Sequence, residues 1–264
     1  MGSATWLVSH GGRRWVAKAV AAPLRAQFAG GLAVATVLDR AGIPAGAPLP
    51  ALDGRSLVDA DGAALALLTW VEGDPLTSAG IDEQRVIGET LARAHRRLQR
   101  ASVAGAQRFH RVRPQADHLT LRPWIRPAVT AAVAALDQLG PASLTWGLLH
   151  TDPAPDHFRL DTFSGRCGVI DWSVAMIGPL LYDLASAVMY VGGPDHGQHL
   201  IDAYLRSAIV TAAEVDRALP TMLRFRWAVQ ADYFARRIAN HDLTGITGPA
   251  DNEKGLEDAR RWLS

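Results

Sequence analysis

The sequence contains a single cysteine, Cys167, in 264 residues, which excludes an internal disulfide framework and favours a reducing, cytoplasmic setting. It has no excess of basic residues, since 27 Lys and Arg stand beside 26 Asp and Glu, so nucleic acid is not an expected partner. It also lacks an apolar run that could span a membrane, and its first residues do not resemble a signal peptide. Hydrophobic residues make up 48%, which is enough for one large domain or two closely joined lobes.

The order of predicted elements indicates an α+β fold, with a small β-rich part followed by a larger helical part. β-prone runs on either side of Gly11-Gly12 predict a hairpin, and a second hairpin is predicted to turn near Asp61-Gly62. We place the boundary between two lobes after residue 73, so the lobes are residues 1–73 and 74–264. Predicted helices cover residues 26–41, 82–98 (capped by Asp82), 127–139, 184–191, 196–207, 213–219, 222–240 and 252–263.

Two aspartates carry the strongest functional signal. Asp152 and Asp171 each follow a short apolar run, where a predicted strand gives way to a turn. We expect a hairpin-like connection to bring the two strand ends together at one cleft. Such a pair suits phosphoryl transfer, because one carboxylate can orient and deprotonate an acceptor hydroxyl while the other holds Mg²⁺ against the phosphates. The alternative is that each aspartate only forms a turn or caps a helix, which is the usual role of Asp at a strand end.

The segments around these aspartates resemble the aminoglycoside phosphotransferase and choline kinase group of kinase-like enzymes. That family has a His-Gly-Asp catalytic loop and an Ile-Asp-Trp metal motif, and His150-Thr-Asp152 and Ile170-Asp-Trp172 match them in order and spacing. The resemblance implies a bilobal protein-kinase-like fold and an ATP- and Mg²⁺-dependent transfer reaction. It also implies that Asp152 is the catalytic base and Asp171 the principal Mg²⁺ ligand. His150 and Asp183 would support the catalytic loop, Asp183 as a helix cap.

The same resemblance implies which residues would hold the nucleotide. Lys18 lies on a predicted strand, as does the family's lysine that reaches the α- and β-phosphates of ATP. Ser3 belongs to a run of small residues, 2–5, that is similar to the trailing half of the loop covering the phosphates. Trp70 and Val71 fall at the family's inter-lobe hinge, where backbone groups read the purine. In the simpler alternatives, Lys18 is a solvated charge on an edge strand and Trp70 a core residue.

Three departures from the family pattern affect this site. The chain starts so late in the pattern that we expect an incomplete first strand and phosphate loop. Residues 27–38 contain no acidic side chain, although the family has a glutamate there that pairs with the lysine. The position five after Asp152 is His157 where the family has Asn. Because Mg²⁺ prefers oxygen ligands, we expect neighbouring Asp156 to supply the missing oxygen, with His157 either at the metal or as an ordinary surface histidine.

The acceptor is expected between the catalytic loop and the C-terminal helices. The helix predicted over residues 222–240 offers Gln230, Asp232, Tyr233 and Arg237 as candidate contacts. It also carries four arginines, so an acceptor with a carboxylate, or a peptide, fits at least as well as a cationic acceptor.

Two hypotheses follow. The first is a phosphotransferase that acts on a hydroxyl of a small molecule (antibiotic-like or metabolite) or of a modified peptide. The alternative is a degenerate pseudokinase that binds a peptide or a partner enzyme in a biosynthetic assembly, and the three departures favour it.

Overall fold

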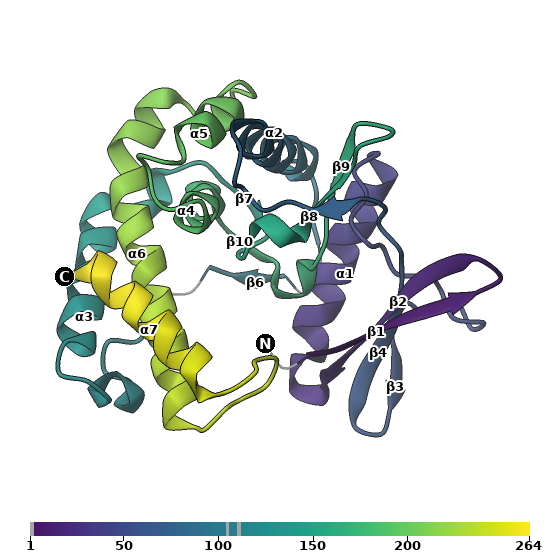
Figure 1. Ribbon diagram of the computed structural model, residues 1–264, viewed down its shortest axis with the longest axis horizontal. Coiled ribbons are helices and arrows are strands. Elements are labelled where there is room, and N and C mark those ends of the chain that lie inside the picture. The colour runs from purple at the N-terminus through teal and green to yellow at the C-terminus, as the bar shows by residue number, and fades with distance from the viewer. Residues whose placement is uncertain (1–2, 104–105, 110–111) are drawn as a thin grey trace.

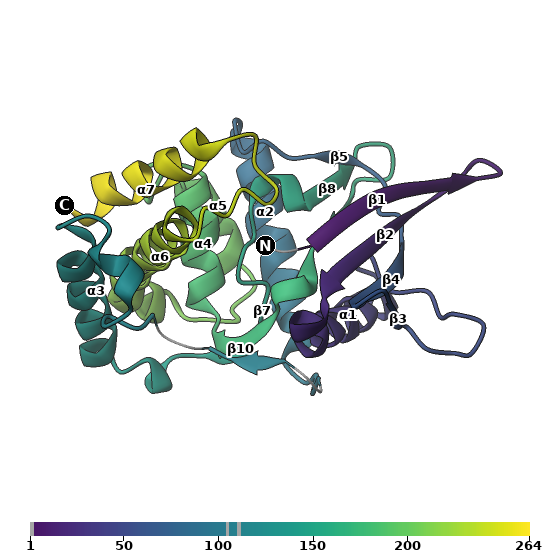
Figure 2. The ribbon, with the colours of Figure 1, turned by 90° about the horizontal axis from the view of Figure 1, so that it is seen from below.

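The computed structural model describes residues 3–103, 106–109 and 112–264, and its small part is built on one antiparallel sheet. The strands lie in the order β1-β2-β4-β3. Both predicted hairpins are confirmed: β1 and β2 join through Gly11-Gly12, and β3 and β4 join through Asp61-Gly62. The β1–β2 hairpin projects away from the rest of the molecule (Figures 1 and 2). The four strands are β1 (Ser3–His10), β2 (Arg13–Ala21), β3 (Val58–Ala60) and β4 (Ala63–Thr69).

Helix α1 (Arg25–Arg40) joins the sheet to the helical part of the molecule (Figure 1). Phe28 and Leu32, four residues apart, pack into a small core against the sheet. Val34 and Leu38 point the other way and belong to the large core of the helical part. The helix therefore has two buried faces, which fixes the sheet against the segments that carry the site.

The larger part is mainly helical, as expected, but two details of the prediction were wrong. Gly80 is the N-cap of α2, so Asp82 lies in the first turn and does not cap the helix. The helices predicted over residues 213–219 and 222–240 form one continuous helix, α6, that runs through Pro220. Packing against α3, α4 and α7 offsets the backbone hydrogen bond that Pro220 cannot donate. The helices are α2 (Ile81–Leu98), α3 (Ile125–Leu139), α4 (Leu181–Tyr190), α5 (Gln198–Leu205), α6 (Ala212–Ala239) and α7 (Pro249–Leu263).

Two three-stranded sheets lie between the helices and the large sheet, in the orders β6-β10-β7 and β5-β8-β9. The strand before Asp152 is β7 and the strand before Asp171 is β9, so the prediction that these two strands form one hairpin was wrong. β7 pairs with β10, and β9 pairs with β8. The strands are β5 (Asp74–Pro75), β6 (Gln107–Arg108), β7 (Trp146–Leu149), β8 (Phe158–Asp161), β9 (Arg166–Val169) and β10 (Met176–Pro179).

The α+β class is confirmed, while the lobe boundary after residue 73 stays a prediction. Gly73 has a φ of 113°, and a Cβ there would lie 2.3 Å from the backbone of Leu160. Glycine is therefore required where the chain passes from the large sheet to β5.

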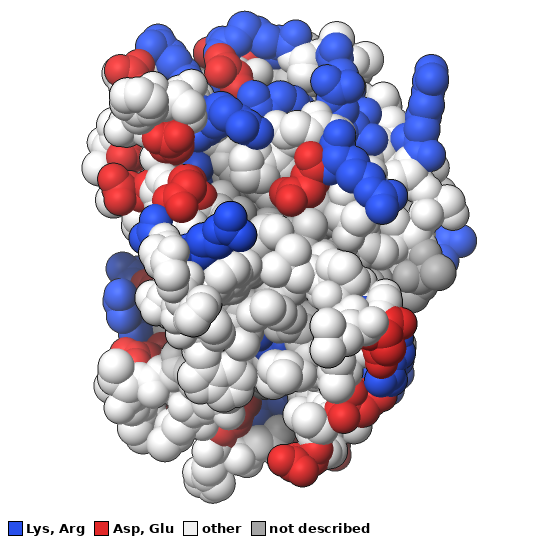
Figure 3. Space-filling view, turned by 90° about the vertical axis from the view of Figure 1, so that its right-hand side faces the viewer, with Lys and Arg blue, Asp and Glu red and all other residues white. Residues whose placement is uncertain are grey.

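Charges of both signs are interspersed on the sheet-side face, around a largely uncharged middle (Figure 3). This mixture agrees with the near balance of acidic and basic residues. Among the described residues, no helix has the length and apolar character needed to cross a membrane.

Candidate active site

The loop that follows β7 is held by the buried carboxylate of Asp183, in the first turn of α4. The backbone N–H groups of His150 and Thr151 donate to Asp183 Oδ2 and Oδ1 at 2.6 and 2.7 Å. His95 Nε2 lies 3.0 Å from Oδ2, and its Nδ1 lies 2.8 Å from the hydroxyl of Tyr204. Asp183 thus contacts the loop that carries Asp152, as predicted, but it is not the cap of α4, whose N-cap is Leu180.

Thr151 occupies the position of the glycine in the family motif and adopts a φ of 74°. This left-handed conformation is unfavourable for a β-branched residue. The backbone N–H of Thr151 donates to Asp183, and the Thr151 hydroxyl donates to the carbonyl of Val174 at 3.1 Å. Hydrogen bonds therefore hold Thr151 in a left-handed backbone conformation that glycine would adopt without strain.

Hydrogen bonds through two histidines join the loops of Asp152 and Asp171. His150 Nε2 lies 2.8 Å from the carbonyl of Ile170, and the Ile170 N–H donates to the carbonyl of His157 at 2.9 Å. His157 Nδ1 in turn lies 2.8 Å from the carbonyl of Asp152. Burial, with a contribution from nearby His157, lowers the pKa of His150, so its imidazole is neutral near pH 7.

Lys18 on β2 pairs with Asp171. Its Nζ lies 2.6 Å from Asp171 Oδ1 and 3.0 Å from Ser173 Oγ, and the lysine is 5% exposed. Burial acts to raise the pKa of Asp171, but the charge of Lys18 and hydrogen bonds from Lys18 and Ser173 outweigh it, so this pKa lies well below its usual range. The alternative of a solvated lysine on an edge strand is excluded, because β2 is an inner strand and Lys18 is buried.

Helix α1 packs closely against the Asp171 loop in the segment where the resemblance implied a glutamate. A Cβ at Gly31 would lie 2.1 Å from the carbonyl oxygen of Trp172, so the helix lies directly against the backbone that follows Asp171. No acidic side chain fits between them at this point, and Lys18 is positioned by Asp171 and Ser173 instead.

We expect Gly31→Ala to destabilise the protein by about 2–3 kcal/mol, because the added methyl group meets backbone that cannot move aside easily. Thermal or urea unfolding measures this loss. Gly80→Ala is the control for the added methyl group, since a Cβ there meets no atom within 4 Å; because Gly80 is the N-cap of α2, this variant should lose up to about 1 kcal/mol. Equal losses in the two variants would contradict the close contact at Gly31.

A cavity of 270 Å³ lies between the sheet and the Asp171 loop. Trp70 and Val71 line it together with Lys18 and Asp171, as predicted for a nucleotide site. Arg14 covers the Trp70 ring, with the guanidinium carbon 4.5 Å from the ring centroid. Most of the other lining residues are apolar, among them Val16, Phe28, Leu32, Ala35, Leu68 and Ile170.

The prediction that Ser3 belongs to a phosphate-covering loop was wrong, because Ser3 begins strand β1 opposite Val20. Gly2, in the same predicted segment, lies outside the described residues. Thr5, two residues further along β1, lines the cavity.

A second cavity, of 1020 Å³, lies beside α6 and α7. Asp152 lines it, whereas Asp171 lines the first cavity, so the aspartates face adjacent cavities and not one cleft. The turn at Trp172–Val174 separates the two: Ser173 lines the first cavity and Val174 lines the second.

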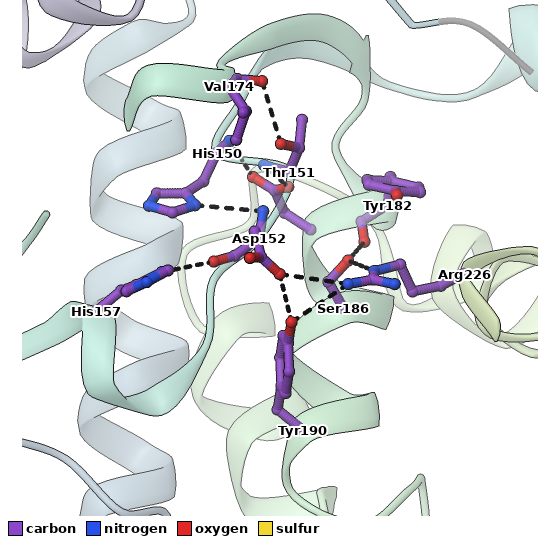
Figure 4. A network of polar contacts seen from close by, with 10 residues as sticks. His150, Thr151, Asp152, His157, Val174, Tyr182, Ser186, Tyr190 and Arg226 are labelled. Carbon is purple, nitrogen blue, oxygen red and sulfur yellow. Dashed lines mark hydrogen bonds and ion pairs between the residues drawn. The ribbon is translucent and has the colours of Figure 1, made fainter. Parts of the chain in front are cut away.

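Two residues that the sequence analysis did not select contact the carboxylate of Asp152 (Figure 4). The Tyr190 hydroxyl donates to Oδ1, and Arg226 Nη2 lies 3.3 Å from the same oxygen. Arg226 is 7% exposed, and its Nε donates to Ser186 Oγ at 3.0 Å. A sequence signal for Arg226 was present, because it lies four residues after Met222 on the buried face of α6, where an apolar residue is the norm.

Comparison with known proteins now identifies the family. A model described as "Phosphotransferase enzyme family" matches residues 2–220, which is most of the chain. The chain belongs to this family. A homoserine kinase of Allorhizobium ampelinum is 30% identical over 195 residues, covering 67% of this chain and 59% of that protein. The chain spans about 59–63% of the length of the first curated relatives it matches.

Solved structures of kinases share the fold. The amicoumacin kinase hAmiN, in complex with AMP-PNP, Ca²⁺ and Ami, superposes with a TM-score of 0.76 at 16% identity, covering 99% of this chain and 85% of that chain. A microcompartment-associated aminopropanol kinase gives a TM-score of 0.75 at 19% identity, covering 100% and 88% of the two chains. The predicted family and the protein-kinase-like fold are therefore confirmed.

For this member of the phosphotransferase family, three of the four predicted acceptor contacts line the larger cavity: Gln230, Asp232 and Tyr233. Asp232 is bound by His118 Nε2 at 2.7 Å. Arg237 does not line the cavity, so its selection was wrong. It is 4% exposed and donates to Asn252, Tyr233 and the Thr244 carbonyl, which ties α6 to the segment leading into α7.

The predicted metal set is not assembled around Asp171. Asp156 is exposed, and His157 Nδ1 is occupied by the Asp152 carbonyl. Across the described residues, no group of three or more His, Cys, Asp or Glu could hold a metal ion. Of the predicted ligands, Asp171 alone lines the cavity that contains Lys18.

Proposed function

We propose that this chain is a phosphotransferase that moves the γ-phosphate of ATP, with Mg²⁺, to a hydroxyl of a small molecule. The main support is the pairing of Lys18 with Asp171 at the mouth of an apolar cavity, while Asp152 faces a larger cavity across one turn of chain. This arrangement provides a nucleotide cavity and an acceptor cavity that meet at two carboxylates. ATP as the donor and the single cysteine accord with the cytoplasmic location that the sequence predicts.

In this proposal each residue has one task. Asp152 orients the acceptor hydroxyl and accepts its proton as the oxygen attacks the γ-phosphorus. Lys18 binds the phosphates, and Asp171 is the residue that would hold Mg²⁺, since a carboxylate is the ligand this ion prefers. The metal, when bound, supplies charge neutralisation on the phosphates. Transfer is direct, with no covalent enzyme intermediate.

The larger cavity offers charged partners of both signs, so it suits an acceptor that carries a carboxylate as well as a cationic group. Its four acidic side chains are all engaged: Asp152 by Arg226, Asp232 by His118, Asp251 by Thr247 and Asp258 by Arg261. Four cations also line the cavity: Arg113, Arg226, Arg236 and Lys254.

The acidic and basic side chains of the lining are therefore balanced, and the cavity lacks the surplus of acidic groups that a polycationic antibiotic would need. Because the curated relatives are homoserine kinases, we propose homoserine or a similar hydroxy amino acid as the first acceptor to test.

The proposal is tested by ADP release from ATP and Mg²⁺ in the presence of L-homoserine, choline or kanamycin in parallel. We expect turnover with the amino acid and little with the two cations. Turnover only with kanamycin would contradict the acceptor class. Absence of ATP binding at millimolar concentration, together with absence of turnover, would favour the pseudokinase hypothesis over the proposed activity.

A further inference from the structure

The carboxylate of Asp152 is occupied by a hydroxyl group of the protein itself. The Tyr190 hydroxyl donates to Oδ1, the kind of hydrogen bond that an acceptor hydroxyl makes to a catalytic base before transfer (Figure 4). Tyr190 and Asp152 both line the larger cavity. An acceptor that enters this cavity therefore competes with the tyrosine for the same oxygen.

The two partners of Asp152 differ in how firmly they are held. Arg226 is 7% exposed and is tied through Nε to Ser186, whose hydroxyl donates to the carbonyl of Tyr182 at 2.9 Å. Tyr190 is the last residue of α4, and it is 37% exposed. Among the described residues, its hydroxyl forms hydrogen bonds with Asp152 and with the Arg226 guanidinium, whose Nη2 lies 3.3 Å away. Arg226 is thus a fixed anchor, whereas Tyr190 can turn towards solvent.

We propose that Tyr190 is a gate on the catalytic base, displaced by a bound acceptor and otherwise shielding Asp152 from water. The inference rests on the proposed function. The gate gives Tyr190 a role in specificity. An acceptor must bind tightly enough to replace the hydrogen bond between Tyr190 and the charged carboxylate of Asp152, and a water molecule replaces that bond poorly. Arg226 keeps Asp152 in place while the exchange occurs.

The step that the gate suppresses is hydrolysis of ATP. In that step the oxygen of water forms a bond to the γ-phosphorus, and the bond from this phosphorus to the ADP oxygen breaks. The water proton passes to Asp152, and the products are ADP and inorganic phosphate. The probe is therefore ATP with Mg²⁺ in the absence of any acceptor, so the test does not depend on knowing the acceptor.

The experiment compares Tyr190→Phe with the unmodified chain. We expect acceptor-independent release of phosphate to rise by roughly tenfold, the factor that corresponds to one hydrogen bond to a charged group. Asp195→Asn is the control, because it is an equally conservative change at an exposed side chain in the turn just after α4. We expect its hydrolysis rate to stay near that of the unmodified chain.

The gate would be overturned if the hydrolysis rate of Tyr190→Phe were unchanged or lower while ATP still raised the melting temperature of the variant. That result would leave the proposed function intact. Failure of ATP to bind the unmodified chain would overturn both. If L-homoserine is a substrate, its KM should fall several-fold in Tyr190→Phe. A fall in kcat without a fall in KM would instead show that the tyrosine assists transfer, and would also overturn the gate.

Discussion

Asp152→Asn is expected to reduce phosphoryl transfer by about 10²–10⁴-fold while leaving nucleotide binding unchanged. Asparagine keeps the size of the side chain and can still contact Arg226 and Tyr190, but it cannot accept the proton of the acceptor hydroxyl. Asp152 lines the acceptor cavity and not the cavity that contains Lys18, so the affinity for ATP should not change. Steady-state kinetics and calorimetric titration with ATP and Mg²⁺ measure the two effects separately.

The control for this variant is Asp195→Asn, an equally conservative change at an exposed carboxylate in the turn after α4. It should leave both the rate and the affinity unaltered. A turnover rate in Asp152→Asn close to that of the control would exclude Asp152 as the base.

Asp171→Asn is expected to abolish the metal-dependent part of nucleotide binding. In the unmodified chain, ATP and Mg²⁺ at a hundred times the dissociation constant should stabilise the fold by about 2.7 kcal/mol, and the variant should lose this gain. The variant without ligand should also unfold about 1–3 kcal/mol more easily, because Lys18 is left buried without its charged partner. Thermal unfolding with and without ATP, Mg²⁺ and EDTA separates the two losses.

Asp156→Asn is the informative comparison for Asp171. The sequence suggests that Asp156 shares the metal, but its exposed position predicts that this variant keeps the nucleotide-dependent stabilisation. If Asp156→Asn lost the stabilisation and Asp171→Asn kept it, the assignment of the metal ligand would be wrong.

The elements that local sequence patterns define were predicted well. The two hairpins turn at Gly-Gly or at Asp-Gly, and the apolar spacing of residues 82–98 predicted helix α2. The helix break expected near Pro220 was wrong, because tertiary packing along both sides of α6 outweighs the local penalty of proline.

The site could be predicted only as far as its residues follow a linear motif. Asp152 and Asp171 were selected from their spacing and their flanking apolar runs, and Lys18 from the resemblance to the family. Their relation in space was not predictable, because β7 and β9 pair with strands other than each other. Tyr190 and Arg226 reach Asp152 from helices far along the chain, and no spacing rule connects them.

The contact at Gly31 is a second example of a feature that depends on the fold. In the sequence, the missing glutamate on α1 reads as a defect of the nucleotide site. In the structure, the same helix lies against the backbone of Trp172, and Lys18 is held by Asp171 and Ser173. Lys18 therefore has charged and polar partners although α1 carries no glutamate.

A crystal structure with a non-hydrolysable ATP analogue and Mg²⁺ tests the central claim most directly. We predict the purine next to Trp70 and Val71, the metal on Asp171, and the Lys18 ammonium on the phosphates and no longer 2.6 Å from Asp171 Oδ1. A bound analogue that lay outside this cavity, with the ion pair of Lys18 and Asp171 intact, would contradict the account.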